Sequence, residues 1–233
     1  MIKIENVTIH GLEETIRGMR NPMNSWDKSD SGICGGGDAH IGCDNCCEHD
    51  CGHSFDGDFH VGKADHELMM KLAAGGPVHA KYRRMITVYV DITAPLYWWK
   101  EFDTYKVGTV ANSCSTMHKI HSKEFTLDDF SFERMSTCLY GGKSPIVALH
   151  YIIDCLNGAR EQYLATKDKG YWWDMIQLLP SSYNQKRTVM LNYEVLVGIY
   201  RWRKEHKLDE WREFCQWIEQ LPYSGIITRK ECH

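Results

Sequence analysis

HAKYRRMITVYVDITAPLYWWKEFDTYKVGTVANSCSTMH, residues 79–118, is the stretch of sequence that decides the fold. Within it, the segment from Met85 to Asp91 carries β-branched side chains at the alternating spacing of a strand. Pro95 follows and can occupy the first turn of a helix over LYWWKEFDTY, which we expect to end near Tyr105. The stretch therefore predicts a strand that leads directly into an aromatic-rich helix.

Three other segments show the periodicity of regular secondary structure. Residues 2–9 alternate apolar and polar side chains, which predicts a half-buried strand. Apolar positions recur at helical spacing over residues 145–166, and residues 209–220 carry a shorter amphipathic pattern. We expect helices from both of these segments.

Two further helices are predicted. Asp65 is suited to be the N-cap of a short helix that ends at Gly75. Residues 182–204 carry apolar side chains on nearly every side, which predicts a long helix that is buried all round. In a chain of this size, such a helix favours an interface between subunits.

Length and composition indicate one ordinary globular domain over residues 1–233, because hydrophobic residues make up 43% and charged residues 25%. The net charge of -4 and the pI of about 6.3 argue against a general electrostatic grip on duplex nucleic acid or on an anionic membrane. No apolar run approaches the roughly 20 residues of a membrane span, and MIKIENVTIHGLEE lacks the features of a signal peptide. We therefore expect a cytoplasmic protein.

Residues 30–62 differ in kind from the rest of the chain and read as a Cys- and His-rich insertion. Zinc favours four Cys or His ligands from short loops, and a structural zinc would supply folding energy that this apolar-poor segment lacks. The alternatives are a loop of reduced cysteines and, more remotely, an iron–sulfur cluster. Cys47, His49 and His53 stay open as further ligands. The preferred ligands are Cys34, Cys43, Cys46 and Cys51.

Residues 79–118 resemble the flavin-dependent thymidylate synthases. They reproduce a leading His, a strand ending in Ala-Pro, an aromatic-rich helix and the place of the family's Arg-His-Arg, Ser, Glu, Ser, Arg signature. Residues 178–211 resemble the family's later Leu-Pro segment, long helix and following His and Trp, so that the similarity spans about residues 65–220. The resemblance implies an α/β (α+β) fold with an antiparallel or mixed sheet flanked by long helices, here with the Cys-rich insertion.

The resemblance implies three residues that contact FAD. His79 matches the family's leading His, and Asn192 matches a flavin-contacting Asn. At the Arg-His-Arg position this chain has Thr104, Tyr105 and Lys106, so that one cation is kept. A lysine does not reproduce the planar, bidentate fork of an arginine. Lys106 is the remaining candidate for holding the cofactor by its charge.

The resemblance also implies a nucleotide-facing segment. The family's acidic residue falls at Asn112, its pyrimidine-facing serine at Cys114 and its final arginine at Thr116. Ser113 and Ser115 lie in the same segment. Cys114 is either a nucleophile, activated by a neighbouring cation, or a small buried replacement for serine.

Arg203 matches the family's pyrimidine-activating arginine, and the resemblance gives it a catalytic and substrate-binding role. It lies eleven residues after Asn192, about three turns at 3.6 residues per turn, which predicts that both project from one helix face. The alternative is that Arg203 belongs to a solvated helix end with Arg201 and Lys204.

Two functions follow from this reading. The first is an enzyme that binds FAD and dUMP or a related pyrimidine nucleotide and transfers a one-carbon unit to it, with folate and NADPH as further partners and a homotetramer as the assembly. The second is a homologue that binds only a nucleotide or a protein partner in the old pocket, because a fold can persist after its chemistry is replaced. A phage or prophage origin would suit such a diverged relative.

Overall fold

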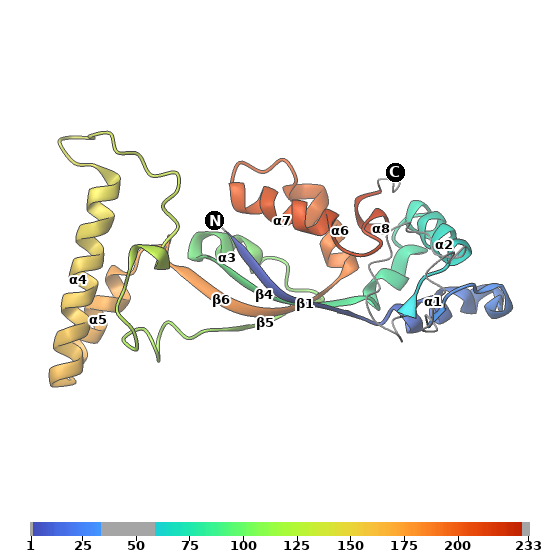
Figure 1. Ribbon diagram of the computed structural model, residues 1–233, viewed down its shortest axis with the longest axis horizontal. Helices are drawn as coiled ribbons and strands as arrows, with labels where there is room; N and C mark the ends of the chain where they lie inside the picture. The colour runs from blue at the N-terminus through green and yellow to red at the C-terminus, as the bar shows by residue number, and fades with distance from the viewer. Residues whose placement is uncertain (1, 34–58, 230–233) are drawn as a thin grey trace, which may run out of the picture. The chain divides into compact units, whose positions relative to one another are not determined.

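The computed structural model describes residues 2–33 and 59–229 (Figure 1). The strands are β1 (Lys3–His10), β2 (Gly32–Ile33), β3 (Phe59–His60), β4 (Thr87–Pro95), β5 (Val110–Ser113) and β6 (Asn184–Asn192). The helices are α1 (Leu12–Arg20), α2 (Lys63–Ala74), α3 (Leu96–Phe102), α4 (Pro145–Thr166), α5 (Lys169–Leu178), α6 (Tyr193–Arg203), α7 (Asp209–Glu219) and α8 (Gly225–Thr228). In this part of the chain, no helix combines the length and the apolar character needed to cross a membrane.

The strands form a four-stranded sheet in the order β1-β4-β6-β5 and a separate two-stranded sheet. In the small sheet, β2 and β3 pair antiparallel, with Gly32 opposite His60 and Ile33 opposite Phe59. The mixed α/β architecture predicted from the sequence is thus confirmed.

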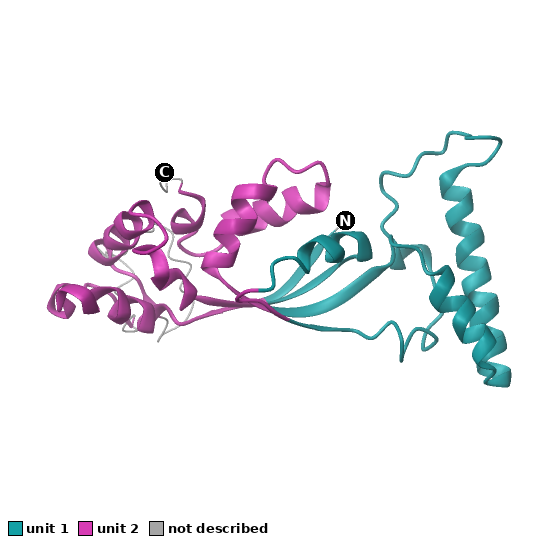
Figure 2. Ribbon diagram, turned by 180° about the vertical axis from the view of Figure 1, so that it is seen from behind, with its two compact units in different colours: residues 1–6, 90–106, 111–189 teal, residues 7–89, 107–110, 190–233 magenta. Residues whose placement is uncertain are grey.

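The chain divides into two compact units (Figure 2). Unit 1 consists of residues 1–6, 90–106 and 111–189, and unit 2 of residues 7–89, 107–110 and 190–233. The single domain over residues 1–233 and the insertion at 30–62 stay predictions.

The core of unit 1 has two parts. Around α3, the side chains of Trp98, Trp99 and Phe102 are buried and their rings contact one another. Farther along the chain, α4 packs against α5 over a second apolar cluster. Its buried members are Ile120, Phe125, Phe130, Leu149, Ile153, Leu156 and Met175.

In unit 2, α6 packs against α7 and α8. The amphipathic pattern of residues 209–220 is confirmed, because α7 buries the apolar side chains that its periodicity selects. Arg83 is buried in this core, where its Nε lies 2.9 Å from Glu194 Oε2 and its Nη1 donates to the carbonyl of Ile226. The buried members of α7 are Glu210, Trp211, Phe214, Cys215 and Ile218.

The long helix predicted over residues 182–204 is wrong, because the segment contains two elements. Strand β6 runs to Asn192, and α6 begins at the next residue. Val189 and Leu191 are buried at strand spacing, whereas Leu196 and Ile199 are buried at helical spacing. The apolar residues of the strand recur every second position, and those of the helix recur every three to four positions. When the whole segment is taken as one helix, these apolar residues together appear to cover every side.

The N-cap predicted at Asp65 is also wrong, because α2 begins at Lys63 and its N-cap is Gly62. Backbone N–H groups in the first turn of this helix donate hydrogen bonds to a side chain outside the helix. The side chain of Asp30 accepts hydrogen bonds from the backbone N–H groups of Ala64 (2.8 Å) and Asp65 (3.1 Å). Asp65 itself lies inside the first turn and is fully buried.

The aromatic-rich helix is shorter than predicted. It spans α3 and ends at Phe102 rather than near Tyr105, with Pro95 as its N-cap. The predicted strand before it is confirmed as β4, and the strand predicted over residues 2–9 is confirmed as β1. The helix predicted over residues 145–166 matches α4 at both ends.

The buried Asp65 carboxylate anchors the segment that precedes β2. It accepts hydrogen bonds from Arg20 Nε (2.6 Å), Ser29 Oγ (2.6 Å) and Ser31 Oγ (2.7 Å). Burial alone would raise the pKa of Asp65, but the hydrogen bonds from Ser29, Ser31 and Arg20 outweigh it and hold the pKa below its ordinary value.

We expect Asp65→Asn to lower the free energy of unfolding by about 3 kcal/mol, because it leaves the buried Arg20 guanidinium without a counter-charge. Since the pKa of Asp65 is lower in the folded state than in the unfolded chain, its contribution is present near neutral pH and is lost as pH falls. Urea unfolding at pH 7 and at a pH well below 3.8, the ordinary pKa of an aspartate, measures both effects. The control is Glu67→Gln, an exposed carboxylate on the same helix. Equal losses in the two variants would contradict the anchoring role.

Candidate functional site

A cavity of about 270 Å³ in unit 1 contains part of the predicted site. Four stretches of chain line it: the end of β4, the residues after β5, the turn around residues 123–129 and the start of β6. The structure thus brings Cys114 and Ser115 together with polar groups that the sequence analysis did not select. The lining residues are Thr93, Cys114, Ser115, Thr116, Lys123, Asp128, Asp129, Tyr183, Asn184, Gln185 and Lys186.

Hydrogen bonds fix the Cys114 segment at the wall of this cavity. The Cys114 N–H donates to the carbonyl of Lys186 (2.9 Å), and Gln185 Nε2 donates to the carbonyl of Cys114 (2.8 Å). One residue on, Ser115 Oγ accepts from the N–H of His118 (2.9 Å) and closes a turn. The thiol of Cys114 is exposed, so that the prediction of a small buried replacement for serine is wrong.

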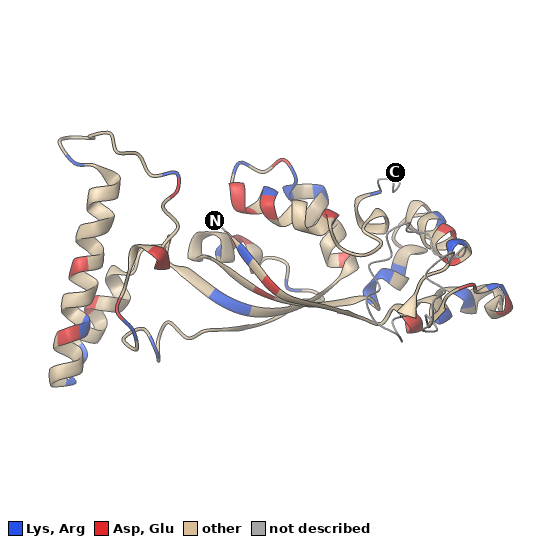
Figure 3. Ribbon diagram, in the orientation of Figure 1, with Lys and Arg blue, Asp and Glu red and all other residues tan. Residues whose placement is uncertain are grey.

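Lys186 supplies a positive charge at the same wall. Its Nζ lies 3.1 Å from Asp91 Oδ2 and 3.7 Å from Glu5 Oε2. The hydrogen bond to Asp91 raises the pKa of Lys186, so that the ammonium group is charged at neutral pH. Hydrogen bonds from Thr188, Asn6 and Lys186 in turn lower the pKa of Asp91 to about 2. Figure 3 shows the basic residues of β6 as a blue band on that strand.

The lining residues from the turn around residues 123–129 are of mixed charge. Lys123 pairs with Asp129, and Asp128 adds a second carboxylate. Burial, with smaller contributions from Asp129 and Cys114, raises the pKa of Tyr183, so that its phenol stays protonated and can donate. The cavity therefore offers both hydrogen-bond donors and hydrogen-bond acceptors. Lys186 is the lysine whose segment is hydrogen-bonded to Cys114.

The other predicted residues of unit 1 lie near this segment but outside the cavity lining. Asn112 and Ser113 form the exposed end of β5, and Lys106 is exposed between α3 and β5. Their assignment to substrate and cofactor stays a prediction.

In unit 2, Asn192 caps α6: its Oδ1 accepts from the N–H of Val195 (3.1 Å). The turn at 107–110 approaches this cap closely. Gly108 has φ +80°, and a Cβ there would lie 2.9 Å from Asn192 Nδ2 and 3.2 Å from a methyl of Val195. A glycine is required at position 108 for both reasons. Asn192 thus has a structural role beside its predicted contact with flavin.

Arg203 is the last residue of α6. Its guanidinium lies 4.7 Å from the centre of the Trp211 ring, and its Nη1 is 3.1 Å from His206 Nε2. Because Asn192 precedes the helix, the prediction that both residues project from one helix face is wrong. His79 is exposed at the start of a short 3₁₀ turn in the same unit. The contact of His79 with FAD and the catalytic and substrate-binding role of Arg203 stay predictions.

The predicted zinc ligands Cys34, Cys43, Cys46 and Cys51 lie outside the described residues, as do the alternatives Cys47, His49 and His53. Within residues 2–33 and 59–229, no group of three or more Cys, His, Asp or Glu side chains is arranged to hold a metal ion. Zinc binding stays a prediction.

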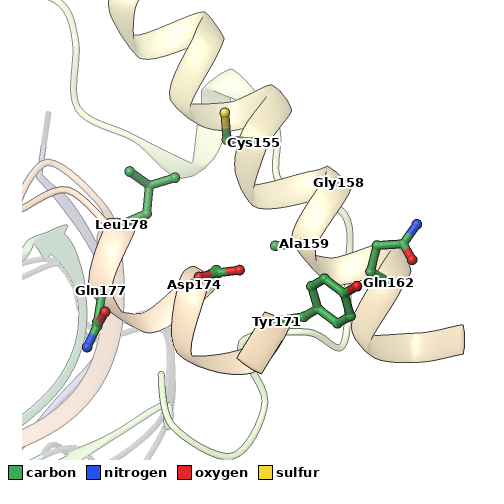
Figure 4. A pocket seen from close by; sticks show the side chains of 8 residues that line it. All are labelled: Cys155, Gly158, Ala159, Gln162, Tyr171, Asp174, Gln177 and Leu178. Atoms are coloured by element: carbon green, nitrogen blue, oxygen red, sulfur yellow. The ribbon is translucent and has the colours of Figure 1, made fainter. Parts of the chain in front are cut away.

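A second hollow, a groove of about 570 Å³, lies between α4 and α5 (Figure 4). Cys155, Gly158 and Ala159 line it from α4, and Asp174 faces Ala159 from α5. Val147, Tyr151 and Trp173 on the same helices expose apolar side chains. The homotetramer stays a prediction.

Solved structures match this chain over nearly its whole length. Two structures of the flavin-dependent thymidylate synthase of Helicobacter pylori, both with FAD and dUMP, are 13% identical to it. One has a TM-score of 0.59 and covers 97% of this chain and 95% of that chain. The other has a TM-score of 0.58 and covers 99% and 98%. The chain has the fold of the flavin-dependent thymidylate synthases.

A structure of a nucleotide methylase also matches. A UMP/dUMP methylase of Streptomyces cacaoi, bound with 5-Br UMP, has a TM-score of 0.57 at 12% identity and covers 94% of this chain and 88% of that chain. No protein-family model matches the chain, and no curated protein matches its sequence. At these identities the likeness shows the fold alone.

We expect Asn192→Ala to lower the free energy of unfolding by about 1 kcal/mol through loss of the cap, and Asn192→Asp to stay near the wild-type value, because aspartate is an equally good N-cap. Thermal unfolding of the two variants measures this difference. If Asn192→Asp is destabilised as much as Asn192→Ala, the packing of Nδ2 on Gly108, and not the cap, is the main structural role of this residue.

Proposed function

We propose that this protein binds a pyrimidine nucleotide, UMP or dUMP, and that it uses FAD to complete the transfer of a one-carbon unit to the pyrimidine. The single observation that carries the proposal is the cavity in which Cys114 and Ser115 meet Lys186. A polar cavity with one well-placed ammonium group suits a ligand that combines an anionic phosphate with a hydrogen-bonding ring. The shared fold with proteins that bind dUMP or 5-Br UMP supports the same ligand class.

In this proposal each residue has a stated part. Lys186 binds the phosphate, while Asn112, Ser113 and Ser115 contact the nucleotide through their amide and hydroxyl groups. Arg203 faces the pyrimidine, where a guanidinium favours negative charge on a ring oxygen. Cys114 presents an exposed thiol to the same cavity and is the candidate nucleophile.

The donor groups of His79, Lys106 and Asn192 fit a flavin diphosphate in kind. Lys106 carries a positive charge, and the Nδ2 of Asn192 is a donor that remains after its Oδ1 has capped α6. When bound, the flavin supplies the reducing equivalents for the methyl group, and NADPH and folate are the proposed sources of the electrons and of the carbon. A homotetramer is the proposed assembly.

A second function is favoured by specific substitutions in the chain. Thr104 and Thr116 stand where the family resemblance implies arginines, and neither side chain carries charge. Lys186 does not depend on those positions, because it belongs to β6. A protein that binds the nucleotide without flavin chemistry is therefore the alternative.

We expect Lys186→Met to weaken dUMP binding at least about tenfold and to leave the binding of deoxyuridine unchanged, because the ammonium group contacts only the phosphate. Lys186→Arg keeps the charge and should stay within a few-fold of the wild type. Calorimetric titration measures all three proteins, with Lys71→Met, an exposed lysine of α2, as the control. An equal loss for dUMP and deoxyuridine in Lys186→Met would contradict the phosphate contact.

Titration with FAD separates the enzyme from the alternative function. A flavoprotein should change FAD fluorescence in a saturable manner, and the change should be weaker in Lys106→Met because a diphosphate loses its cation. The matched control is Lys100→Met, an exposed lysine of α3. Unchanged FAD fluorescence together with tight dUMP binding would establish the nucleotide-binding alternative.

A further inference from the structure

Arg187 on β6 is held in unit 1 by three partners. Its guanidinium lies 4.2 Å from the centre of the Trp99 ring. Its Nη1 donates to Asp103 Oδ1 (2.7 Å), and its Nε donates to Gln185 Oε1 (3.0 Å). A planar guanidinium can stack and donate in its plane at the same time, which a lysine cannot do.

Gln185 continues this network to the cavity. Its side chain is buried: Oε1 accepts from Arg187 and Nε2 donates to the carbonyl of Cys114. Its own carbonyl accepts from Trp99 Nε1 (2.9 Å), which fixes the backbone at this position. An amide presents a donor on one side and an acceptor on the other, so that only one orientation satisfies both partners. The network therefore starts at Arg187, which donates to Asp103 on one side and to Gln185 on the other, and Gln185 passes it on by donating to Cys114.

The two ends of the network lie at the two ends of the segment that carries the predicted site. Asp103 follows α3 directly and precedes Thr104, whereas Cys114 follows β5 directly. Strand β5 is exposed along its whole length, so that apolar packing does little to fix the segment that follows it. The hydrogen bond from Gln185 and the bond from the Cys114 N–H to Lys186 hold that segment instead.

We propose that Gln185 and Arg187 are positioning residues of the nucleotide site, which hold residues 114–116 at the cavity wall before the ligand arrives. The inference rests on the proposed nucleotide binding and adds to it two residues that act through Cys114. When residues 114–116 are already ordered, binding of the ligand does not cost the conformational entropy of ordering them. The network therefore contributes to the affinity for the nucleotide.

The substitution Gln185→Glu separates positioning from folding. A glutamate has the same shape and still accepts from Arg187, but its carboxylate cannot donate to the Cys114 carbonyl. We expect the affinities for dUMP and for deoxyuridine to fall alike, by about tenfold, because one hydrogen bond is replaced by the approach of two acceptors. Repulsion by the new carboxylate, at a residue that itself lines the cavity, would weaken the binding of dUMP alone. The unfolding temperature should stay close to that of the wild type, because the hydrogen bond from Arg187 is kept and becomes an ion pair. Gln216→Glu, the same change at an exposed position of α7, should leave both quantities unchanged.

Hydrogen exchange without nucleotide tests the positioning by itself. The peptide that contains residues 110–118 should exchange about tenfold faster in Gln185→Glu than in the wild type, because a hydrogen bond of about 1.4 kcal/mol corresponds to that factor. Arg187→Lys should change exchange and affinity in the same direction, since a lysine cannot hold Asp103 and Gln185 together.

The two measurements distinguish failure of this inference from failure of the proposed function. Unchanged exchange in both variants overturns the inference, whatever dUMP does. Faster exchange together with unchanged tight binding of dUMP also overturns it, because the order of residues 114–116 would then not serve the ligand. If wild-type protein does not bind dUMP or UMP, the proposed nucleotide binding fails, and with it the positioning for that ligand, even if exchange shows that Gln185 orders the segment.

Discussion

The alternation of side chains along β6 is the constraint on which the candidate site depends. Gln185, Arg187 and Val189 point to one face, where they meet Trp99 and the core. Lys186 and Thr188 point to the other face, where both contact Asp91. Because successive residues of a strand face opposite sides, a shift of register by one residue would exchange the two sets. One short strand thus provides both the cation of the cavity and the network that holds its wall.

Local signals predicted the elements whose causes are local. Helix α4 was predictable at both ends because Pro145 suits a first turn and the apolar spacing continues to Thr166. The boundary at Asn192 was not found, because a single residue ends β6 and caps α6, and the apolar side chains continue across it. Asp65 looked like a cap because its real partners, Arg20 and Ser31, are 45 and 34 residues away. Burial of a carboxylate depends on such distant partners, and local sequence does not show them.

The candidate site likewise combines residues that the sequence indicated with residues that it did not. Family resemblance selected Cys114 and Ser115, and the structure places both at one cavity. Lys186 and Gln185 were missed because they reach that cavity from a segment 71 residues farther along the chain. The sequence did contain a signal for these residues, because polar residues interrupt the apolar pattern at the start of β6. A polar side chain on the inner face of a strand requires a hydrogen-bond partner. Gln185 and Arg187 are such residues, and they are each other's partners.

The positions of the charged residues bear on which of the two proposed functions suits this chain. Thr104 and Thr116 carry no charge, whereas Lys186 brings a positive charge to the cavity from β6 and is held by Asp91. The other lysine of the lining, Lys123, pairs with Asp129. In the proposed function, nucleotide binding therefore depends on the alternation of β6, and flavin binding depends on His79, Lys106 and Asn192. Thr104 removes a charge from the flavin-binding signature and Thr116 removes one from the nucleotide-facing segment, but Lys186 depends on neither position. In the second proposed function the chain binds the nucleotide without flavin, and the contact between Lys186 and Asp91 allows this because it does not involve the signature segment.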